Sequence, residues 1–405
     1  MSETVLTEAE LAERSGATPD FVPRLVQLGI LPGRDGDRPF VPGDIHRVRL
    51  AQAFEQSGIP LEAIGKAIAA GELSFDFVDR MFIYDTPLTG KTFREIAEEL
   101  GVPIEVLTRL YPMWGLPRPG PDDVVREDDA PTFSEWKRFF PAEALNERLL
   151  LQGARLFGES ARRLAEWGFE LYKEYMQAPL LASGMSRQEA IDASSAFSAV
   201  GIPMMERQFV WLLRRHLEHN TIQLIVEHVE NAVEVVGAAP PKAAKPPAIA
   251  FIDLSGYTAM TEEIGDQAAA ERAAALATLI QELAHAHGGT VVKLLGDGAM
   301  LHFPDPEEGV LCGLELVDRV EKAGLPPARV GIAAGPVVVR EGDCYGRVVN
   351  VAARVMDQAN PRQVLATAEV VTASQGDLVR FEDVGTVELR GVSAPIWLSL
   401  AAPTS

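Results

Sequence analysis

A proline-rich stretch divides this sequence into two parts that cannot share one continuous helix or sheet. Residues 237–247 read GAAPPKAAKPP. Proline lacks a backbone N–H group and fixes φ, so it interrupts helices and central strands. A linker of this composition is semi-rigid and spans at most ~3 Å per residue. We therefore expect a multidomain chain whose two halves fold separately on either side of the linker.

Composition sets the class of protein. The chain has 405 residues, 47% of them apolar, which is enough for two or three packed domains. Its net charge of −21 disfavours non-specific binding to nucleic acid or anionic lipid. The sequence has no run of 18 apolar residues, no secretory signal at its start, and only the cysteines Cys312 and Cys344. We expect a cytoplasmic protein with no transmembrane segment and no disulfide framework.

The segment after the linker places two aspartates at the ends of neighbouring strands. The letters AIAFIDLSGYT predict a buried strand over 248–252 that ends in Asp253, followed by a tight Ser255-Gly256 turn. The letters GTVVKLLGDGAMLHF predict a β-hairpin with Asp297 in its turn. Paired carboxylates are usual ligands for Mg²⁺ or Mn²⁺ that bridge the phosphates of a nucleotide. Asp297 alone is an ordinary hairpin residue, and it gains this interpretation only together with Asp253.

Three motifs in this half resemble the signature blocks of class III nucleotidyl cyclases. They are FIDLSGYT, KLLGDGAM and DCYGRVVNVAAR, in the order of the family and at compatible distances, and the resemblance extends over 247–401. It implies an adenylate cyclase, a phosphorus-oxygen lyase that converts ATP to 3′,5′-cyclic AMP and pyrophosphate in signal transduction. It also implies two divalent metal ions, Mg²⁺ or Mn²⁺, in each active site.

The resemblance assigns the metal ions and the phosphates to the first two motifs. Asp253 and Asp297 would ligate both ions. The backbone carbonyl of Leu254 would add a metal ligand. The backbone N–H groups of the turn would surround the phosphates as a nest does; they belong to Ser255, Gly256, Tyr257 and Thr258.

Base selection and catalysis fall to four further positions. Lys293 and Asp343 match the residues of the family that read the base: a lysine donates to adenine N1 and an aspartate accepts from its 6-amino group, whereas guanine presents the opposite pattern. ATP is therefore expected rather than GTP. Asn350 and Arg354, at i and i+4 on one helix face, match the asparagine that orients the ribose and the arginine that stabilises the pentavalent phosphate. The basic residue of the family that contacts the triphosphate has no clean match, and Arg390 is a candidate.

The family also implies a homodimer. Its metal-binding aspartates and its asparagine–arginine pair reach one site from opposite subunits, so a chain that carries all six residues is expected to form two shared sites. The short Gly342–Gly346 motif GDCYG resembles that of a bacterial subclass in which the N-terminal half controls the dimer.

The expected fold of 248–405 is an α+β sandwich with its helices on one face, like the ferredoxin-like core of the cyclases. The sequence predicts helices, hairpins and closing strands in alternation after the first strand. The helices are expected at 266–287, 306–323 and 346–359, the hairpins at 290–303 and 328–341, and the strands at 363–366, 379–384 and 387–400.

The N-terminal half is expected to be all-α. Residues 1–75 begin with a capping-box-like Thr7–Glu10 and resemble a MerR-type winged-helix module, and 76–142 contain a second helix-turn-helix-like pattern with a loop at 117–131. Either the first module binds DNA or it is a packing module with solvated arginines. DNA binding would use Arg24, Arg34, Arg38, Arg47 and Arg49. The first 120 residues hold 18 acidic and 12 basic side chains, which argues against DNA as a partner.

Residues 143–236 have helical periodicity, which indicates a dimerisation and regulatory region before the linker. An effector of this half would be a small molecule, a lipid or the proton. Aromatic residues could line an apolar ligand pocket, although such spacing is typical of ordinary core; they are Phe157, Trp167, Phe169, Tyr172 and Trp211. His216, His219 and His228 are either a pH-dependent switch or three solvated helix residues.

A second function competes with catalysis. The chain could be a nucleotide-sensing transcription regulator in which 6–73 binds DNA and a weakly active cyclase block binds ATP. The presence of Asp253, Asp297, Asn350 and Arg354 argues against this alternative, because a sensor does not need transition-state residues.

Overall fold

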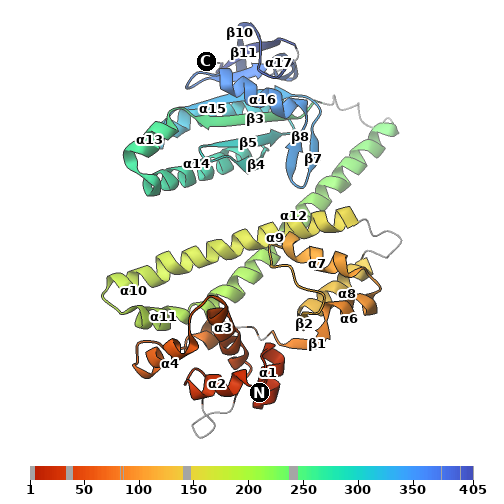
Figure 1. Cartoon of the computed structure of the whole chain (residues 1–405). Helices are drawn as coiled ribbons and strands as arrows, with labels where there is room; N and C mark the ends of the chain where they lie inside the picture. The colour runs from red at the N-terminus through yellow and green to blue at the C-terminus, as the bar shows by residue number, and fades with distance from the viewer. Residues whose placement is uncertain are drawn as a thin grey trace. The chain divides into compact units, whose positions relative to one another are not determined.

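The structure, a computed structural model, describes residues 5–32, 40–82, 84, 86–139, 147–236, 245–374, 376–392 and 394–404, without the side chains of Phe139 and Thr258. The chain forms two compact units, Met1–Glu230 and Asn231–Ser405, which are drawn in Figure 1. Within these ranges no helix combines the length and apolarity needed to cross a membrane.

A seven-stranded mixed sheet organises the second unit. Its order is β10-β11-β9-β6-β3-β5-β4, and every neighbouring pair is antiparallel except β6 and β9, which are parallel. The bounds are β3 Ala248–Leu254, β4 Thr290–Leu294, β5 Gly298–Phe303, β6 Ala328–Ala334, β9 Val364–Thr367, β10 Val379–Val387 and β11 Ile396–Pro403. A separate hairpin pairs β7 (Val338–Arg340) with β8 (Asp343–Tyr345).

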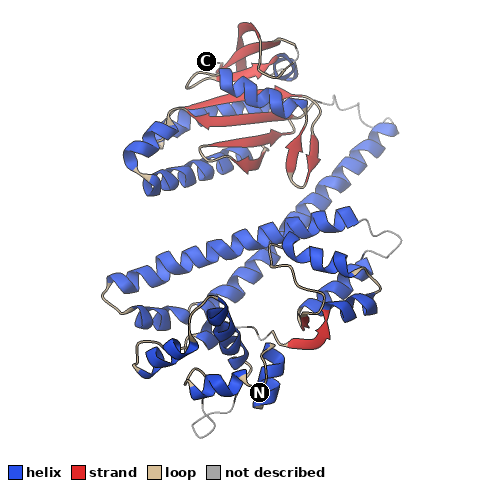
Figure 2. Cartoon of the chain, viewed as in Figure 1, coloured by secondary structure: helices blue, strands red, loops and turns tan. Residues whose placement is uncertain are grey.

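Helices cover both faces of this sheet, so the expectation of helices on one face is wrong (Figure 2). Alternate residues of β3 face opposite sides: Ala250 and Ile252 pack with α14 (Asp266–Ala286) and α15 (Pro306–Lys322), while Ile249 and Phe251 pack with α16 (Arg347–Gln358). The side of α16 that contacts the sheet is its apolar stripe, Val348, Val351, Ala352 and Val355.

The predicted elements of this unit mostly match the structure. Five of them are confirmed, and their observed ends differ from the predicted ends by no more than two residues: the strand at 248–252, the hairpin at 290–303 and the helices at 266–287, 306–323 and 346–359. The hairpin at 328–341 is wrong, because β7 pairs with β8 and not with β6. Two short helices were not predicted, α13 (Tyr257–Ile264) and α17 (Ala368–Ala373).

Helix α16 lies unusually close to β6. A Cβ atom placed on Gly331 would lie 2.0 Å from the backbone nitrogen of Met356, so only glycine permits this approach. The helix that carries Asn350 and Arg354 is thereby held directly against the strand that pairs with β3.

The first unit is helical and contains two apolar clusters. One joins the helices up to α4 and the other joins α6, α7, α8 and α9. The helices up to this point are α1 Glu8–Ser15, α2 Phe21–Gln27, α3 Asp44–Gln56, α4 Leu61–Ala69, α5 Val78–Met81, α6 Phe93–Leu100, α7 Ile104–Met113 and α8 Asp129–Phe139. The capping box predicted at Thr7 is confirmed, and Thr92 forms a second one at the start of α6. The loop expected at 117–131 contains a strand, β2 (Val124–Arg126), which pairs with β1 (Leu88–Thr92).

The arginines proposed for DNA contacts are mostly engaged inside this unit. Arg47 is 5% exposed and bonds to Asp44 and Asp79, since the two carboxylates compensate its burial. Arg49 donates to Thr86 and to a backbone carbonyl, and Arg24 forms ion pairs with Glu55 and Glu62. These contacts favour the packing-module alternative over DNA binding through Arg47 and Arg49. Arg34, Arg38 and the whole wing expected around them lie outside the described residues, so the winged-helix resemblance stays a prediction.

Helices follow, as expected, and two of them, α9 and α12, are long. They are α9 Glu147–Leu171, a π-helical turn at Tyr172–Gln177, α10 Ala178–Ala182, α11 Arg187–Ser195 and the 38-residue α12 Ser198–Val235. None of the α12 residues is buried, although many are large and apolar, among them Trp211 and Ile225, which are 54% and 56% exposed. A helix with this much exposed apolar surface is suited to packing against another chain.

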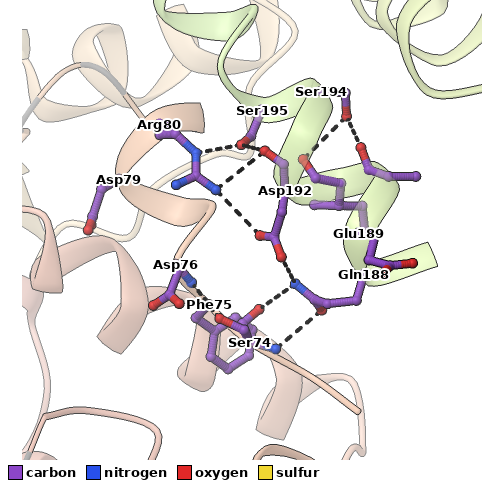
Figure 3. A network of polar contacts seen from close by, with 12 residues as sticks. Ser74, Phe75, Asp76, Asp79, Arg80, Gln188, Glu189, Asp192, Ser194 and Ser195 are labelled. Atoms are coloured by element: carbon purple, nitrogen blue, oxygen red, sulfur yellow. Dashed lines mark hydrogen bonds and ion pairs between the residues drawn. The ribbon is translucent and has the colours of Figure 1, made fainter. Parts of the chain in front are cut away.

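A network of hydrogen bonds joins the segment after α4, which contains Ser74 and Arg80, to α11 (Figure 3). Arg80 donates to Ser195 at 2.7 Å and to the carboxylate of Asp192 at 3.4 Å, while Gln188 bonds to the backbone of Ser74. The N-terminal helices thereby hold the segment that leads into α12.

Candidate active site

The two predicted metal-binding aspartates lie over one hollow at the end of the sheet. Asp253 is near the end of β3, and Asp297 lies in the β4–β5 turn beside it, where its carbonyl accepts a hydrogen bond from the N–H of Leu254 at 3.1 Å. The hollow has a volume of about 420 Å³. Its lining consists of Asp253, Leu254, Ser255, Gly256, Tyr257, Asp297 and Arg329.

Glycine makes this approach of β5 to β3 possible. A Cβ on Gly298 would lie 2.3 Å from the carbonyl oxygen of Ile252, and Gly296 has φ +70. The Gly-Asp-Gly turn therefore presents Asp297 beside Asp253 because its neighbours have no side chains.

Arg329 supplies positive charge to this hollow. It lies on β6 directly opposite Asp253, and its Nε and Nη2 atoms donate to Oδ2 of Asp253 at 2.9 and 2.6 Å. Burial raises the pKa of the Asp297 carboxyl; the Asp253 carboxylate raises it further, and Arg329 opposes the shift. The two carboxylates therefore repel each other, and Arg329 offsets part of that repulsion.

The turn after β3 differs in part from its predicted role. Gly256, with φ +83, precedes the first turn of α13. The N–H of Ser255 donates to the carbonyl of Pro327 at 2.9 Å and is not free to hold a phosphate. The hydroxyl of Tyr257 donates to the carbonyl of Ala269, which fixes α13 to α14. The backbone N–H groups at 256–258 remain the candidates for phosphate contacts, and the side chain of Thr258 is not described.

Lys293 and Asp343 contact each other within one chain. The Nζ atom lies 3.0 and 2.8 Å from the two carboxylate oxygens, and this hydrogen bond lowers the pKa of the Asp343 carboxyl. The pair joins β4 to the β7–β8 hairpin, and both side chains remain partly exposed, at 42% and 27%.

Asn350 and Arg354 lie on the exposed side of α16, opposite its buried stripe. Arg354 forms an ion pair with Asp357 at 2.9 Å. Neither residue belongs to the lining of the aspartate hollow. The described part of one chain therefore presents two partial sites, one acidic and one that carries Asn350 and Arg354.

The donor set of the hollow fits a hard divalent cation. Two carboxylates from adjacent strands and the Leu254 backbone offer oxygen ligands, and the repulsion between Asp253 and Asp297 is what a cation would relieve. These residues match a magnesium or manganese site better than a zinc site, which prefers nitrogen and sulfur ligands.

A family model, "Adenylate and Guanylate cyclase catalytic domain", matches residues 240–399, which include most of the sheet and both aspartates. A second model, "Adenylate cyclase regulatory domain", matches 44–221. The chain belongs to the adenylate cyclase family and is an enzyme of the phosphorus-oxygen lyase class.

Relatives share both halves. The chain is 30% identical over 312 residues to the pH-sensitive adenylate cyclase of Mycobacterium tuberculosis, an alignment that covers 75% of this chain and 76% of the relative. It is 28% identical over 295 residues to the adenylate cyclase of Streptomyces coelicolor, with 73% of each chain covered. Among solved structures, the adenylyl cyclase CyaB from P. aeruginosa is 22% identical, with a TM-score of 0.36 over 40% of this chain and 95% of that one.

Arg329 was not predicted from the sequence as a site residue. Its signal was a charged residue within the otherwise apolar strand ARVGIAA, but only the strand register reveals that it faces Asp253. Arg390, the candidate for the triphosphate contact, lies in the β10–β11 turn; the register of β11 with β9 puts that turn at the opposite end of the sheet from Asp253.

The predicted aromatic residues of the helical region do not form a closed core. Phe157 and Phe169 are 57% and 59% exposed and line a hollow of about 820 Å³ together with Trp114 and Phe209. Trp167 and Trp211 lie outside this lining, and Tyr172 bonds to Ser194. His216, His219 and His228 are all exposed on α12, so the switch hypothesis has no buried group to support it.

Proposed function

We propose that this protein converts ATP to 3′,5′-cyclic AMP and pyrophosphate at two sites shared between two copies of the chain. The observation that carries the proposal is the separation of the site into two parts: Asp253 and Asp297 over one hollow, and Asn350 with Arg354 on a helix face outside it. A second copy can bring the two parts together.

In the proposed reaction the 3′-hydroxyl oxygen of ATP bonds to the α-phosphorus, the bond from that phosphorus to the bridging oxygen of the β-phosphate breaks, pyrophosphate leaves with that oxygen, and the hydroxyl proton passes to water. Divalent ions, when bound to Asp253 and Asp297, would stabilise charge on the attacking and leaving oxygens. Arg354 would donate its guanidinium N–H groups to the pentavalent phosphate, and Asn350 would orient the ribose.

Lys293 and Asp343 would read the base. Their ion pair places a donor and an acceptor next to each other on one chain, which complements the N1 and 6-amino groups of adenine. Their contact also supports the view that both belong to the same half of the shared site as Asn350 and Arg354.

Exposed apolar residues beside this pair support dimerisation. They are Leu294, Leu295, Val338, Val339 and Tyr345, each at least 45% exposed. They lie on β4, in the turn after it, and on β7 and β8, the elements that carry or adjoin Lys293 and Asp343, and apolar surface of this kind is typical of interfaces.

The N-terminal half would regulate the dimer. The support is the match to a regulatory domain, the exposed apolar surface of α12, and the hollow lined by Phe157 and Phe169, which is the candidate site for a small-molecule or lipid effector. The competing DNA-binding function is not favoured, because Arg47 and Arg49 bond within the unit. A cytoplasmic location and the ferredoxin-like description of the core stay predictions.

The test of the shared site is complementation. Purified full-length chain should form cyclic AMP from ATP with Mn²⁺ or Mg²⁺, and Asp253→Asn and Arg354→Ala should each abolish most of this activity. Mixing the two variants should restore about a quarter of the wild-type activity, because half of the dimers are mixed and each mixed dimer has one intact site. If the mixture stays inactive while both variants fold and exchange subunits, the shared site is wrong.

The histidine hypothesis has its own test. Replacing His216, His219 and His228 together by Gln should leave the pH profile of cyclic AMP formation unchanged if they are solvated helix residues. A shifted profile would support the switch instead.

A further inference from the structure

The proposed metal site depends on two carboxylates, and the guanidinium of Arg329 is hydrogen-bonded to one of them, that of Asp253. Both of its hydrogen bonds end on Oδ2 of Asp253, at 2.9 and 2.6 Å, and the two side chains are 29% and 23% exposed. They form a cross-strand pair on adjacent antiparallel strands, where side chains share one face of the sheet. The contact is therefore fixed by strand register and is not a chance surface pairing.

A cation at this position and Arg329 would compete for the same oxygen. A divalent ion bound to Oδ2 would stand next to a positive guanidinium, and like charges at such range repel strongly in a partly buried site. Arg329 lines the hollow together with the backbone that follows β3, where the phosphates are proposed to bind. A triphosphate in this hollow would offer the guanidinium a new anionic partner with bidentate geometry.

We propose that Arg329 holds Asp253 in the nucleotide-free enzyme and transfers to the triphosphate when the nucleotide binds, so that Asp253 becomes available to metal only as the phosphates arrive. This inference rests on the proposed metal-binding role of Asp253. Arg329 is then a positioning residue for Asp253 that couples the affinity for metal to the affinity for nucleotide. Such coupling is reciprocal: the nucleotide strengthens metal binding by the same factor as the metal strengthens nucleotide binding.

The test is metal binding to the full-length enzyme without nucleotide. Titration with Mn²⁺, followed by the electron paramagnetic resonance signal of free Mn²⁺, should show that Arg329→Gln binds the ion about tenfold more tightly than the wild type. A non-cyclisable ATP analogue should strengthen Mn²⁺ binding by the wild type, and this enhancement should shrink about tenfold in Arg329→Gln.

A matched control separates the contact from the loss of one positive charge. Arg380 lies on β10, pairs with Glu382 and is 61% exposed, so Arg380→Gln changes the net charge equally without touching the hollow. We expect Mn²⁺ affinity to stay at the wild-type value in this variant. The double variant Asp253→Asn with Arg329→Gln should show no gain, because the oxygen for which the two cations compete is altered.

The outcomes distinguish this inference from the proposed function. Unchanged or weaker Mn²⁺ binding by folded Arg329→Gln, with binding still lost in Asp253→Asn, overturns the exchange and leaves the metal site intact. Normal Mn²⁺ binding by Asp253→Asn overturns the metal site itself. If Arg329→Gln fails to fold, Arg329→Met decides: it keeps an apolar side chain of similar length without the charge, and an Mn²⁺ affinity equal to the wild type contradicts the proposal.

Discussion

The ammonium group of Lys293 on β4 lies 2.8 Å from a carboxylate oxygen of Asp343 on β8, across 50 residues of sequence. The two residues that are proposed to read the base therefore neutralise each other before any base is present. Adenine must exchange this ion pair for two hydrogen bonds to its own edge, and a base with the reversed pattern would leave both charges unsatisfied.

The first prediction concerns this selectivity. Lys293→Glu combined with Asp343→Cys should invert the preference, lowering kcat/KM for ATP and raising the GTP-to-ATP ratio by about 10²-fold, because the donor and acceptor pattern is reversed. The measurement is kcat/KM for both nucleotides. An unchanged ratio in a folded variant would show that other residues select the base.

The second prediction concerns Arg354. Arg354→Ala should lower kcat by about 10²-fold or more, because a developing phosphate charge loses a preorganised donor. Asp357→Asn, which removes only the ion-pair partner of Arg354, is the matched control on the same helix and should keep most of the activity. Thermal melts should confirm folding of both variants, and full activity of Arg354→Ala would refute its role.

A third prediction follows from the buried thiol of Cys312 on α15. Burial raises the pKa of this thiol, and the nearby negative charges of Glu315 and Glu308 raise it further, from 9.0 to about 12. Between these values the unfolded chain loses the proton and the native chain keeps it, so this group lowers stability as pH rises, by up to about 1.4 kcal/mol per pH unit.

Cys312→Ala should remove that slope while adding a pH-independent loss of packing. Urea unfolding of the wild type and of the variant at pH 8 and pH 10 measures both effects. Curves that stay parallel across this range would contradict the assignment.

A fourth prediction concerns the contacts of Arg80 in Figure 3. Arg80→Ala leaves Asp192 and Ser195 without their donor, so amide hydrogen exchange in α11 should become faster and stability should fall by about 1 kcal/mol. Arg187→Ala on α11 is the control, because it removes an arginine side chain that is exposed on that helix. Equal exchange rates in the two variants would mean that the network does not hold α11.

In the catalytic unit, local sequence patterns predicted where helices and strands begin and end. They predicted less well how these elements pack against one another. The Gly-Asp-Gly turn was sufficient to locate the β4–β5 hairpin, and the helix predicted at 346–359 matches α16. Periodicity identifies which side of a helix is buried, but not which face of the sheet it covers, so the position of α16 opposite α14 and α15 was missed. For the same reason β7 was assigned to the wrong partner strand.

Contacts between distant residues were the part that sequence patterns could not supply. The pairing of Arg329 with Asp253 spans 76 residues and depends on the register of β3 with β6. The burial of Arg47 likewise depends on Asp79, which is 32 residues away. In both cases the role of an arginine is set by a carboxylate that is distant in sequence and that the fold brings to it.

Helix α16 packs directly against the backbone of β6 at Gly331. Since no side chain separates this helix from β6, Asn350 and Arg354, the residues proposed to complete the partner's site, cannot shift without disturbing the strand that pairs with β3 and Asp253. In a symmetric pair, ligand binding at either catalytic centre would then be felt at the other, and substrate saturation of such an enzyme should deviate from a simple hyperbola.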